Sequence, residues 1–458
     1  MLGGYHASVM TESDTPVDPP EAGGPEDSAA ALPVLKGQPL PYHLAVRDYL
    51  QTADPSVWNW FVEKSVATDN AAADPAAASS QQHAAAESTR VTLLKTAVRL
   101  DRETERELYA CGERLRDRMG IAAPLTFYQA QNVSEPSAFL VWIPGELHVM
   151  FGGPLRDGLS AAELSAVICH EFAHFELSTL DDGDFLQSER LLQALAVDHA
   201  AASPHERTLR SFRLWTELYC DRRAAEVLDN VDDVISTLIK VETGLKDVNP
   251  RAYVQQAREI IADGRLTSAG VTHPEVYLRA FALDGWAEDP GSVDERLQPL
   301  VEGRLQLDTL DLLQQQRLVR FTQTFVRRFL NAAWLQTRLM VHHAQRFLDP
   351  DAALGQAVPL EVHEVSDAKW DQMQQTIATF DEELRRYLCY VLLDFIRCDA
   401  DLQEGPLAAG FLMCERVGLL AEYRELVQRE LKPGKRALQS VEAGAEKLVQ
   451  DMADGVTA

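Results

Sequence analysis

The segment of residues 160–175 constrains the fold more than any other part of the sequence. Ser160 begins it and Glu163 follows three residues later, which forms a capping box. The serine hydroxyl accepts a hydrogen bond from a first-turn amide, while the carboxylate reaches back to the serine amide. Apolar residues then recur at helical spacing, at Leu164, Val167, Ile168, Phe172 and Phe175. We therefore expect a long helix with one buried face.

The same helix carries His170 and His174, with Glu171 beside the first of them. Residues four apart lie one turn apart on one face, so both imidazoles can reach one metal ion. Zinc accepts imidazole and carboxylate ligands and can keep one position open for water. It lowers the pKa of that water to roughly 7. The pattern predicts a site for one Zn²⁺ ion, and two core histidines are the alternative interpretation of this motif alone.

An open zinc site needs a third protein ligand. Two familiar spacings fail, because Leu180 and Gln193 stand where a histidine or a glutamate would be required. The next candidate is Glu217, on a second helix predicted over residues 207–228. Asp221 lies one turn further on the same face, from which it can hydrogen-bond a ligand imidazole and fix its tautomer.

Strands are predicted before the first helix, over residues 124–129, 138–143 and 146–151. The Pro144-Gly145 pair between the last two indicates a hairpin. From about residue 290 onward the pattern is helical, with a break at 349–359. The predicted fold class is α+β, mainly α, with a small β-sheet and an all-helical C-terminal region.

These motifs together resemble a known family. HEFAH (170–174) followed by ELYCD (217–221) is similar to the HExxH…ExxxD pair of the zinc endopeptidases that include the CAAX prenyl endopeptidases and the heat-shock protease HtpX. The hairpin and helix start also resemble that family, and residues 272–279 resemble its His-Pro-x-x-x-x-Arg segment. The resemblance covers roughly residues 91–286 and implies a zincin-like gluzincin fold with endopeptidase activity.

The resemblance also implies roles for single residues. Glu171 is the expected general base, acting on a water held by zinc. We expect His273 either to stabilise the oxyanion, to cap the metal in a resting state, or only to form a His-Pro turn. We expect Arg279 to pair with Asp221 or Glu217. The metal ligands implied are His170, His174 and Glu217.

A substrate strand is expected along the second arm of the hairpin, because an added β-strand binds through backbone groups. The residues of this expected edge strand are Glu146, Leu147, His148, Val149, Met150 and Phe151. The expected partner is therefore a protein or peptide substrate.

Two departures from the family limit what it implies. Its membrane-embedded members carry spanning helices, whereas the best apolar stretch here, residues 387–396, covers about half of the roughly 20 residues required. Cys220 also replaces a small residue, and we expect Cys169 and Cys220 to be buried, inert thiols. The first residues do not resemble a signal peptide, so a cytoplasmic location is expected.

The formal net charge of −27 excludes some partners. Such a balance repels phosphate backbones and anionic lipid, so we expect neither nucleic acid nor a membrane as a partner.

The composition divides the chain into predicted parts. Residues 370–431 are weakly similar to the helical TerB-like domains of tellurite resistance, although they lack the usual Ala-Asp-Gly triplet. There, Asp399, Asp401 and Glu404 either bind a divalent cation or form a cap led by Asp401. The predicted parts are a disordered acidic tail (1–40), a short helical segment (41–66), a linker (67–90), the metallopeptidase domain (91–286), a helical extension (287–349), a second linker (350–365) and the TerB-like domain (366–458).

Two functions follow as hypotheses. The first is a zinc endopeptidase whose C-terminal helices bind a regulatory protein partner. The alternative is a latent or inactive zinc protein that acts through those C-terminal helices.

Overall fold

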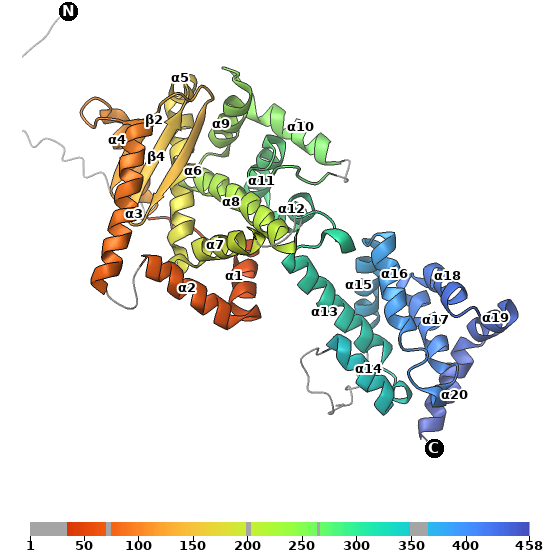
Figure 1. The fold of residues 1–458 in the computed structure, drawn as a ribbon. Helices are drawn as coiled ribbons and strands as arrows, with labels where there is room; N and C mark the ends of the chain where they lie inside the picture. The colour runs from red at the N-terminus through yellow and green to blue at the C-terminus, as the bar shows by residue number, and fades with distance from the viewer. Residues whose placement is uncertain (1–33, 70–74, 198–202, 263–265, 349–364, 458) are drawn as a thin grey trace, which may run out of the picture.

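The computed structural model describes residues 34–457 except 70–74, 198–202, 263–265 and 349–364 (Figure 1). Most of the predicted acidic tail and nearly all of the second linker lie outside these residues. The described part is mainly helical with one small sheet, which confirms the coarse fold class. No helix in it is long and apolar enough to cross a membrane.

The sheet has four strands in the order β1-β2-β4-β3. They are β1 (Ala97–Arg99), β2 (Leu125–Ala130), β3 (Ser137–Ile143) and β4 (Glu146–Gly152). β2 runs parallel to β4, and the other neighbours are antiparallel. Gly145 has a φ of 74° in the predicted hairpin turn, a conformation that glycine adopts without strain.

The predicted substrate edge strand is wrong. β4, which carries Glu146 to Phe151, pairs on both sides, and β3 forms the edge. The hairpin pattern identifies two paired arms, but it does not say which arm meets a further strand. The burial of β4 from Leu147 onward gives the physical reason, since a strand covered on both faces belongs inside a sheet.

Helices cover both faces of the sheet (Figure 1). α3 (Pro75–Thr96) packs on one face, where Leu93 contacts a cluster with Tyr128 and Met150. α4 (Arg106–Arg118) and α6 (Ala161–Thr179) pack on the other face, in the main core.

The prediction of a linker over residues 67–90 also needs correction. α2 (Pro55–Asp69) extends into this range, and α3 occupies it from Pro75 onward. Its many alanines are strong helix formers, and Pro75 stands at a helix start, where proline is favoured.

The predicted capping box is confirmed. The Glu163 amide donates to Ser160 Oγ and the Ser160 amide donates to Glu163 Oε2, at 3.3 and 2.8 Å. The apolar stripe of α6 is buried except at Leu164, which is half-buried. The helix α8 (Pro204–Leu228) matches the second predicted helix and packs against α6. The remaining helices of this half are α1 (Pro41–Ala53), α5 (Leu155–Gly158), α7 (Asp184–Val197), α9 (Val231–Thr243), α10 (Pro250–Ala262), α11 (Val276–Glu288) and α12 (Val293–Val301).

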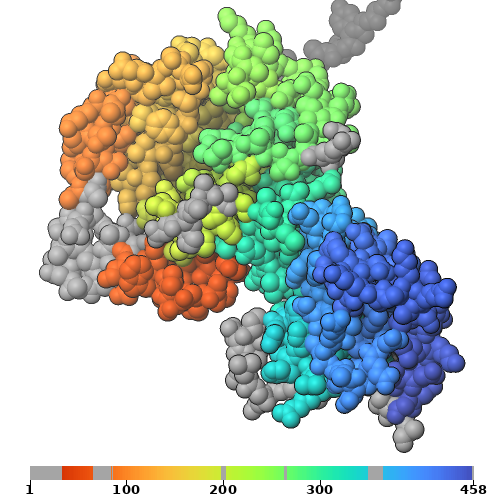
Figure 2. Space-filling view, turned by 45° about the vertical axis from the view of Figure 1, so that its right-hand side comes forward, coloured from red at the N-terminus to blue at the C-terminus, as the bar shows by residue number. Residues whose placement is uncertain are grey.

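Two large hydrophobic cores divide the described chain. The first includes residues of α12 and ends at Leu312 and Leu313, so it reaches beyond the predicted boundary at residue 286. The second begins at Leu310, just before α13, and Figure 2 shows the C-terminal helices as a lobe in blue. Its helices are α13 (Leu312–Phe329), α14 (Arg338–Leu348), α15 (Asp367–Ala378), α16 (Glu382–Leu393), α17 (Gly405–Val417), α18 (Leu420–Glu430), α19 (Lys435–Ala443) and α20 (Ala445–Thr457).

Residues 34–40 and 399–404 differ from expectation. Leu40 is fully buried and the Leu35 amide donates to the Arg118 carbonyl, so residues 34–40 are packed rather than disordered.

In the C-terminal lobe the Asp399 carboxylate accepts a hydrogen bond from the Asp401 amide at 3.0 Å. Asp399, not Asp401, therefore caps this turn.

Candidate metal centre

α6 and α8 bring the three predicted metal ligands together. His170 and His174 lie on one face of α6, with ring centroids 5.0 Å apart. Glu217 faces them from α8: its Oε2 is 3.4 Å from His170 Nε2 and its Oε1 is 3.5 Å from His174 Nε2. The carboxylate thus bridges the two imidazoles.

A cysteine also belongs to this group. One ligand atom each from His170, His174 and Cys220 lie within 4.8 Å of one another, a group that could hold a metal ion. Sequence reasoning treated Cys220 as an inert thiol and missed this placement. The signal was present, because Cys220 follows Glu217 by three residues and such residues share a helix face.

One oxygen of Glu217 lacks a hydrogen-bond partner although it is buried. This atom, Oε2, lies 3.4 Å from His170 Nε2 and 3.5 Å from His273 Nε2. It also lies 3.7 Å from Arg279 Nη2, so its contacts are ion pairs longer than an ordinary hydrogen bond. A buried carboxylate oxygen without a hydrogen bond costs free energy, and such an atom in a native protein requires an explanation. A cation among these side chains would satisfy it, and two imidazoles with a carboxylate are a donor set that suits zinc. The residues present therefore fit the expected ion.

Asp221 and Arg279 support the histidine face as predicted. His170 Nδ1 lies 3.0 Å from Asp221 Oδ1, which leaves Nε2 directed toward Glu217. Arg279 donates to both oxygens of Asp221, from Nε at 2.6 Å and from Nη2 at 2.7 Å. Burial raises the pKa of Asp221, but Arg279 and His170 outweigh it and lower the pKa below its ordinary value. An ionised Asp221 accepts a hydrogen bond from His170 Nδ1 and so orients the ring with Nε2 toward Glu217.

The two histidines differ in pKa, and so do the two glutamates, because burial and neighbouring charges act on each of them differently. Burial lowers the pKa of His170, yet the hydrogen bonds to Asp221 and Glu217 outweigh it and raise the pKa to about 10. Burial dominates at His174 and lowers its pKa to about 4. Glu217 has a lowered pKa because the two histidines and Arg279 outweigh burial. Burial and the charge of Glu217 instead raise the pKa of Glu171 to about 7.

Glu171 is 5% exposed and also accepts a hydrogen bond from the backbone of Leu140 on β3. A carboxyl group with a pKa near neutrality can both take and return a proton at neutral pH. The environment of Glu171 therefore suits a general base.

His273 lies at the mouth of the site. Its side chain is 62% exposed, its Nε2 is 3.5 Å from Glu217 Oε2, and its Nδ1 is 2.9 Å from Thr272 Oγ1. The structure thus brings His273 to the group that sequence reasoning assembled, on the segment that enters α11.

A cleft of about 710 Å³ opens onto these residues. Its lining includes His170, Glu171, Glu217 and Arg279, together with Ser137 and Ala138 of β3. The β4 residues 146–151 do not line it; His148 there bonds to Glu146 at 2.8 Å, and Glu146 pairs with Arg90. The strand beside the cleft is therefore β3.

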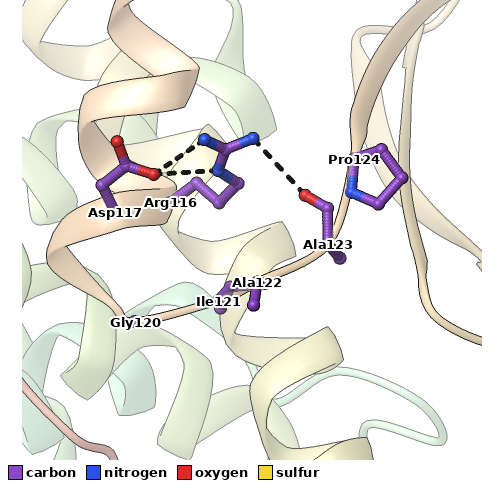
Figure 3. Close-up of a pocket in the computed structure, with 7 residues that line it drawn as sticks. All are labelled: Arg116, Asp117, Gly120, Ile121, Ala122, Ala123 and Pro124. Atoms are coloured by element: carbon purple, nitrogen blue, oxygen red, sulfur yellow. Dashed lines mark hydrogen bonds and ion pairs between the residues drawn. The ribbon is translucent and has the colours of Figure 1, made fainter.

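A second hollow, of about 450 Å³, lies where α4 ends (Figure 3). Arg116 and Asp117 are the charged residues that line it. They pair with each other, and Arg116 also reaches the Ala123 carbonyl at 3.5 Å. This hollow offers no converging set of reactive side chains.

Comparisons with protein-family models, with curated proteins and with solved structures found no match.

Proposed function

We propose that the protein is a zinc-dependent endopeptidase. The observation that carries the proposal is the buried Glu217 carboxylate, which lies between His170 and His174 and has one oxygen, Oε2, without a hydrogen bond. Beside it, Glu171 has a near-neutral pKa and faces a cleft with room for a peptide segment.

Glu217 is the third protein ligand in this proposal, in preference to Cys220. Both side chains lie near the histidines, but their protonation differs. Glu217 has a lowered pKa, whereas burial and the neighbouring carboxylates raise the pKa of the Cys220 thiol well above its ordinary value. An ionised carboxylate is ready to bind a cation, whereas the thiol, like the protonated His170, must first lose a proton. Glu217 also lies between the two imidazoles, within 3.5 Å of each.

The mechanism assigns one task to each side chain. Zinc, when bound, would lower the pKa of a water and polarise a peptide carbonyl. Glu171 accepts the proton of the attacking water and returns it to the leaving amine. Asp221 and Arg279 hold His170 in the tautomer that presents Nε2. His273 stands where it can donate a hydrogen bond to a developing oxyanion.

β3 offers the peptide a place to bind. It is the edge of the sheet, and Ser137 and Ala138 at its start line the cleft. An extended peptide can pair with such a free edge through backbone hydrogen bonds. This arrangement transfers to β3 the substrate role that the sequence assigned to β4.

The test compares wild type with Glu171→Gln and with Glu107→Gln, an exposed glutamate on α4. We expect all three to bind one zinc ion, measured by metal analysis. Wild type and Glu107→Gln should cleave an unfolded casein-like substrate, whereas Glu171→Gln should lose at least about 100-fold in rate. A chelator should abolish cleavage.

Equal cleavage by wild type and Glu171→Gln would refute the mechanism. Zinc binding without cleavage by any variant would favour the alternative, a latent zinc protein.

A further inference from the structure

His273 reaches the metal centre from a segment without regular secondary structure. Residues 266–275 precede α11 and form no helix or strand. Val271, Thr272 and His273 are exposed, yet His273 Nε2 lies 3.5 Å from Glu217 Oε2. An exposed side chain on such a segment keeps its position only where the backbone of the segment is held. The contacts that hold this backbone therefore decide where His273 stands.

Arg210 on α8 binds this segment at two carbonyl groups. Its Nε donates to the Gly270 carbonyl at 2.8 Å, and its Nη2 donates to the Ser268 carbonyl. The planar guanidinium presents its donors in a fixed fork, so two bonds to one segment set both its place and its direction. Arg210 precedes Glu217 by seven residues, and residues at that spacing share a helix face. One helix therefore carries both the proposed metal ligand and the group that holds the His273 segment.

The hold on Gly270 passes directly to His273. A Cβ atom on Gly270 would lie 1.9 Å from the His273 carbonyl oxygen, a separation that carbon and oxygen atoms cannot reach without a clash. The two backbones are therefore in close contact, and a shift of Gly270 must shift His273. The Glu275 carboxylate closes the same turn, because it accepts from Ser268 Oγ at 2.8 Å and from the Ala269 amide at 2.7 Å.

We propose that Arg210 is a positioning residue, which places His273 beside Glu217 by holding the turn that carries it. This inference rests on the proposed endopeptidase function, in which His273 donates to the developing oxyanion. Arg210 does not line the cleft, so its loss should leave substrate binding nearly unchanged. The loss should instead slow the chemical step, because displacing a reacting group by about 1 Å can cost about 100-fold in rate.

The kinetic test uses Arg210→Met, which keeps an unbranched side chain but has no hydrogen-bond donor. With a fluorogenic peptide that the wild type cleaves, kcat should fall about 10–100-fold and KM should change less than about 3-fold. Arg210→Lys keeps a single donor group and should recover part of the loss. Arg213→Met is the matched control, since Arg213 is a half-buried arginine on α8 that pairs with Glu189 of α7 at 2.9 Å. Its kcat should stay within about 3-fold of wild type.

A double-mutant cycle separates positioning from a general effect on the fold. His273→Ala removes the group that Arg210 would position, so Arg210→Met should change kcat less than about 2-fold in that background. Gly270→Ala displaces His273 with Arg210 in place and should reproduce the loss of kcat. It replaces Arg210→Met should that variant fail to fold, as judged by circular dichroism. Additive losses from Arg210→Met and His273→Ala would overturn the inference.

Hydrogen exchange measured by mass spectrometry tests the contact without relying on cleavage. The Ser268, Ala269 and Gly270 amides are hydrogen-bonded. They should exchange at least about 10-fold faster in Arg210→Met than in wild type or Arg213→Met. Unchanged exchange would overturn the inference and leave the endopeptidase proposal intact. Faster exchange in a protein whose wild type cleaves nothing would overturn the endopeptidase proposal, and Arg210 would then only hold this turn.

Discussion

At the scale of single residues, Glu217 and Cys220 show which members of the metal centre can be identified from their spacing along a helix. Glu217 was found because other ligand positions failed and Asp221 follows it by one turn. Cys220 was missed because its chemistry was judged by its neighbours in sequence rather than by the helix face that it shares with Glu217. His170 and His174 needed no tertiary information, since one helix holds both.

Two substitutions test whether Glu217 or Cys220 is the third metal ligand. Glu217→Gln keeps the shape but loses the anionic ligand, so zinc affinity should fall at least about 100-fold. Cys220→Ser removes a neutral, buried thiol, and affinity should change less than about 3-fold. Competition with a chromophoric chelator measures both. The opposite ranking would make Cys220 the ligand.

Asp221→Asn tests whether Asp221 orients His170 through its hydrogen bond to Nδ1. The substitution removes the charge that pairs with buried Arg279, so the free energy of unfolding should fall by about 3–5 kcal/mol. Zinc affinity should fall about 10–100-fold, because His170 loses the acceptor that fixes its tautomer. The double variant Asp221→Asn with Arg279→Met should recover stability in urea unfolding without recovering zinc affinity. Recovery of both would assign the pair a purely structural role.

At the scale of elements, local patterns predicted helices better than they predicted the sheet. The capping box and apolar stripe located α6, and periodicity located α8. The arms of the hairpin were found too, but their order in the sheet depends on the parallel pairing of β4 with β2, between residues far apart in sequence. Alanine-rich α3 was misread as a linker because it lacks apolar periodicity over much of its length.

Glu163, in the capping box of α6, should make the stability of the protein depend on pH. Burial alone raises the pKa of Glu163, but hydrogen bonds from Lys240, Ser236 and Ser160 outweigh it and lower the pKa to about 2, from an ordinary value of 4.5. This stabilisation is therefore present above about pH 4.5 and is lost as the pH falls toward 2. It corresponds to about 3 kcal/mol.

Urea unfolding of Glu163→Gln against wild type at several pH values checks this. The difference between them should be largest near pH 7 and shrink below about pH 4.5. Glu107→Gln, in the exposed first turn of α4, serves as the control. A difference that stays constant with pH would contradict the account.

At the scale of the whole molecule, two long-range connections were invisible to the sequence. α13 belongs to both cores: Leu312 and Leu313 lie in the first, and Phe325 lies in the second. Its start is tied to the first half by the Leu312 amide, which donates to Thr208 Oγ1 at 3.0 Å. A continuous helical pattern cannot reveal such a shared element, and the first core extends past the predicted boundary at residue 286.

The second connection joins the described N-terminal segment to α6 and α8. Glu176 and Arg223 form a buried ion pair with a 2.8 Å contact, and each follows a residue of the metal centre by two positions. The Gly37 amide donates to Glu176 Oε1 at 2.9 Å, and Arg223 Nη2 donates to the Leu35 carbonyl at 3.0 Å. Residues 34–40 therefore complete the polar contacts of a buried pair on the two helices that hold the candidate ligands.

Deleting residues 1–38 should consequently weaken the whole first half, whereas deleting residues 1–33 is the matched control. The longer deletion removes one partner each from Glu176 and Arg223, and a lost partner of a buried polar group costs about 1–3 kcal/mol. The free energy of unfolding should thus be roughly 2–4 kcal/mol lower for the longer deletion than for the shorter one. Zinc affinity should fall with the longer deletion alone, because α6 and α8 lose a shared anchor. Equal stability of the two deletions in urea would show that water replaces both contacts, and that residues 34–40 contribute nothing to the support of the metal centre.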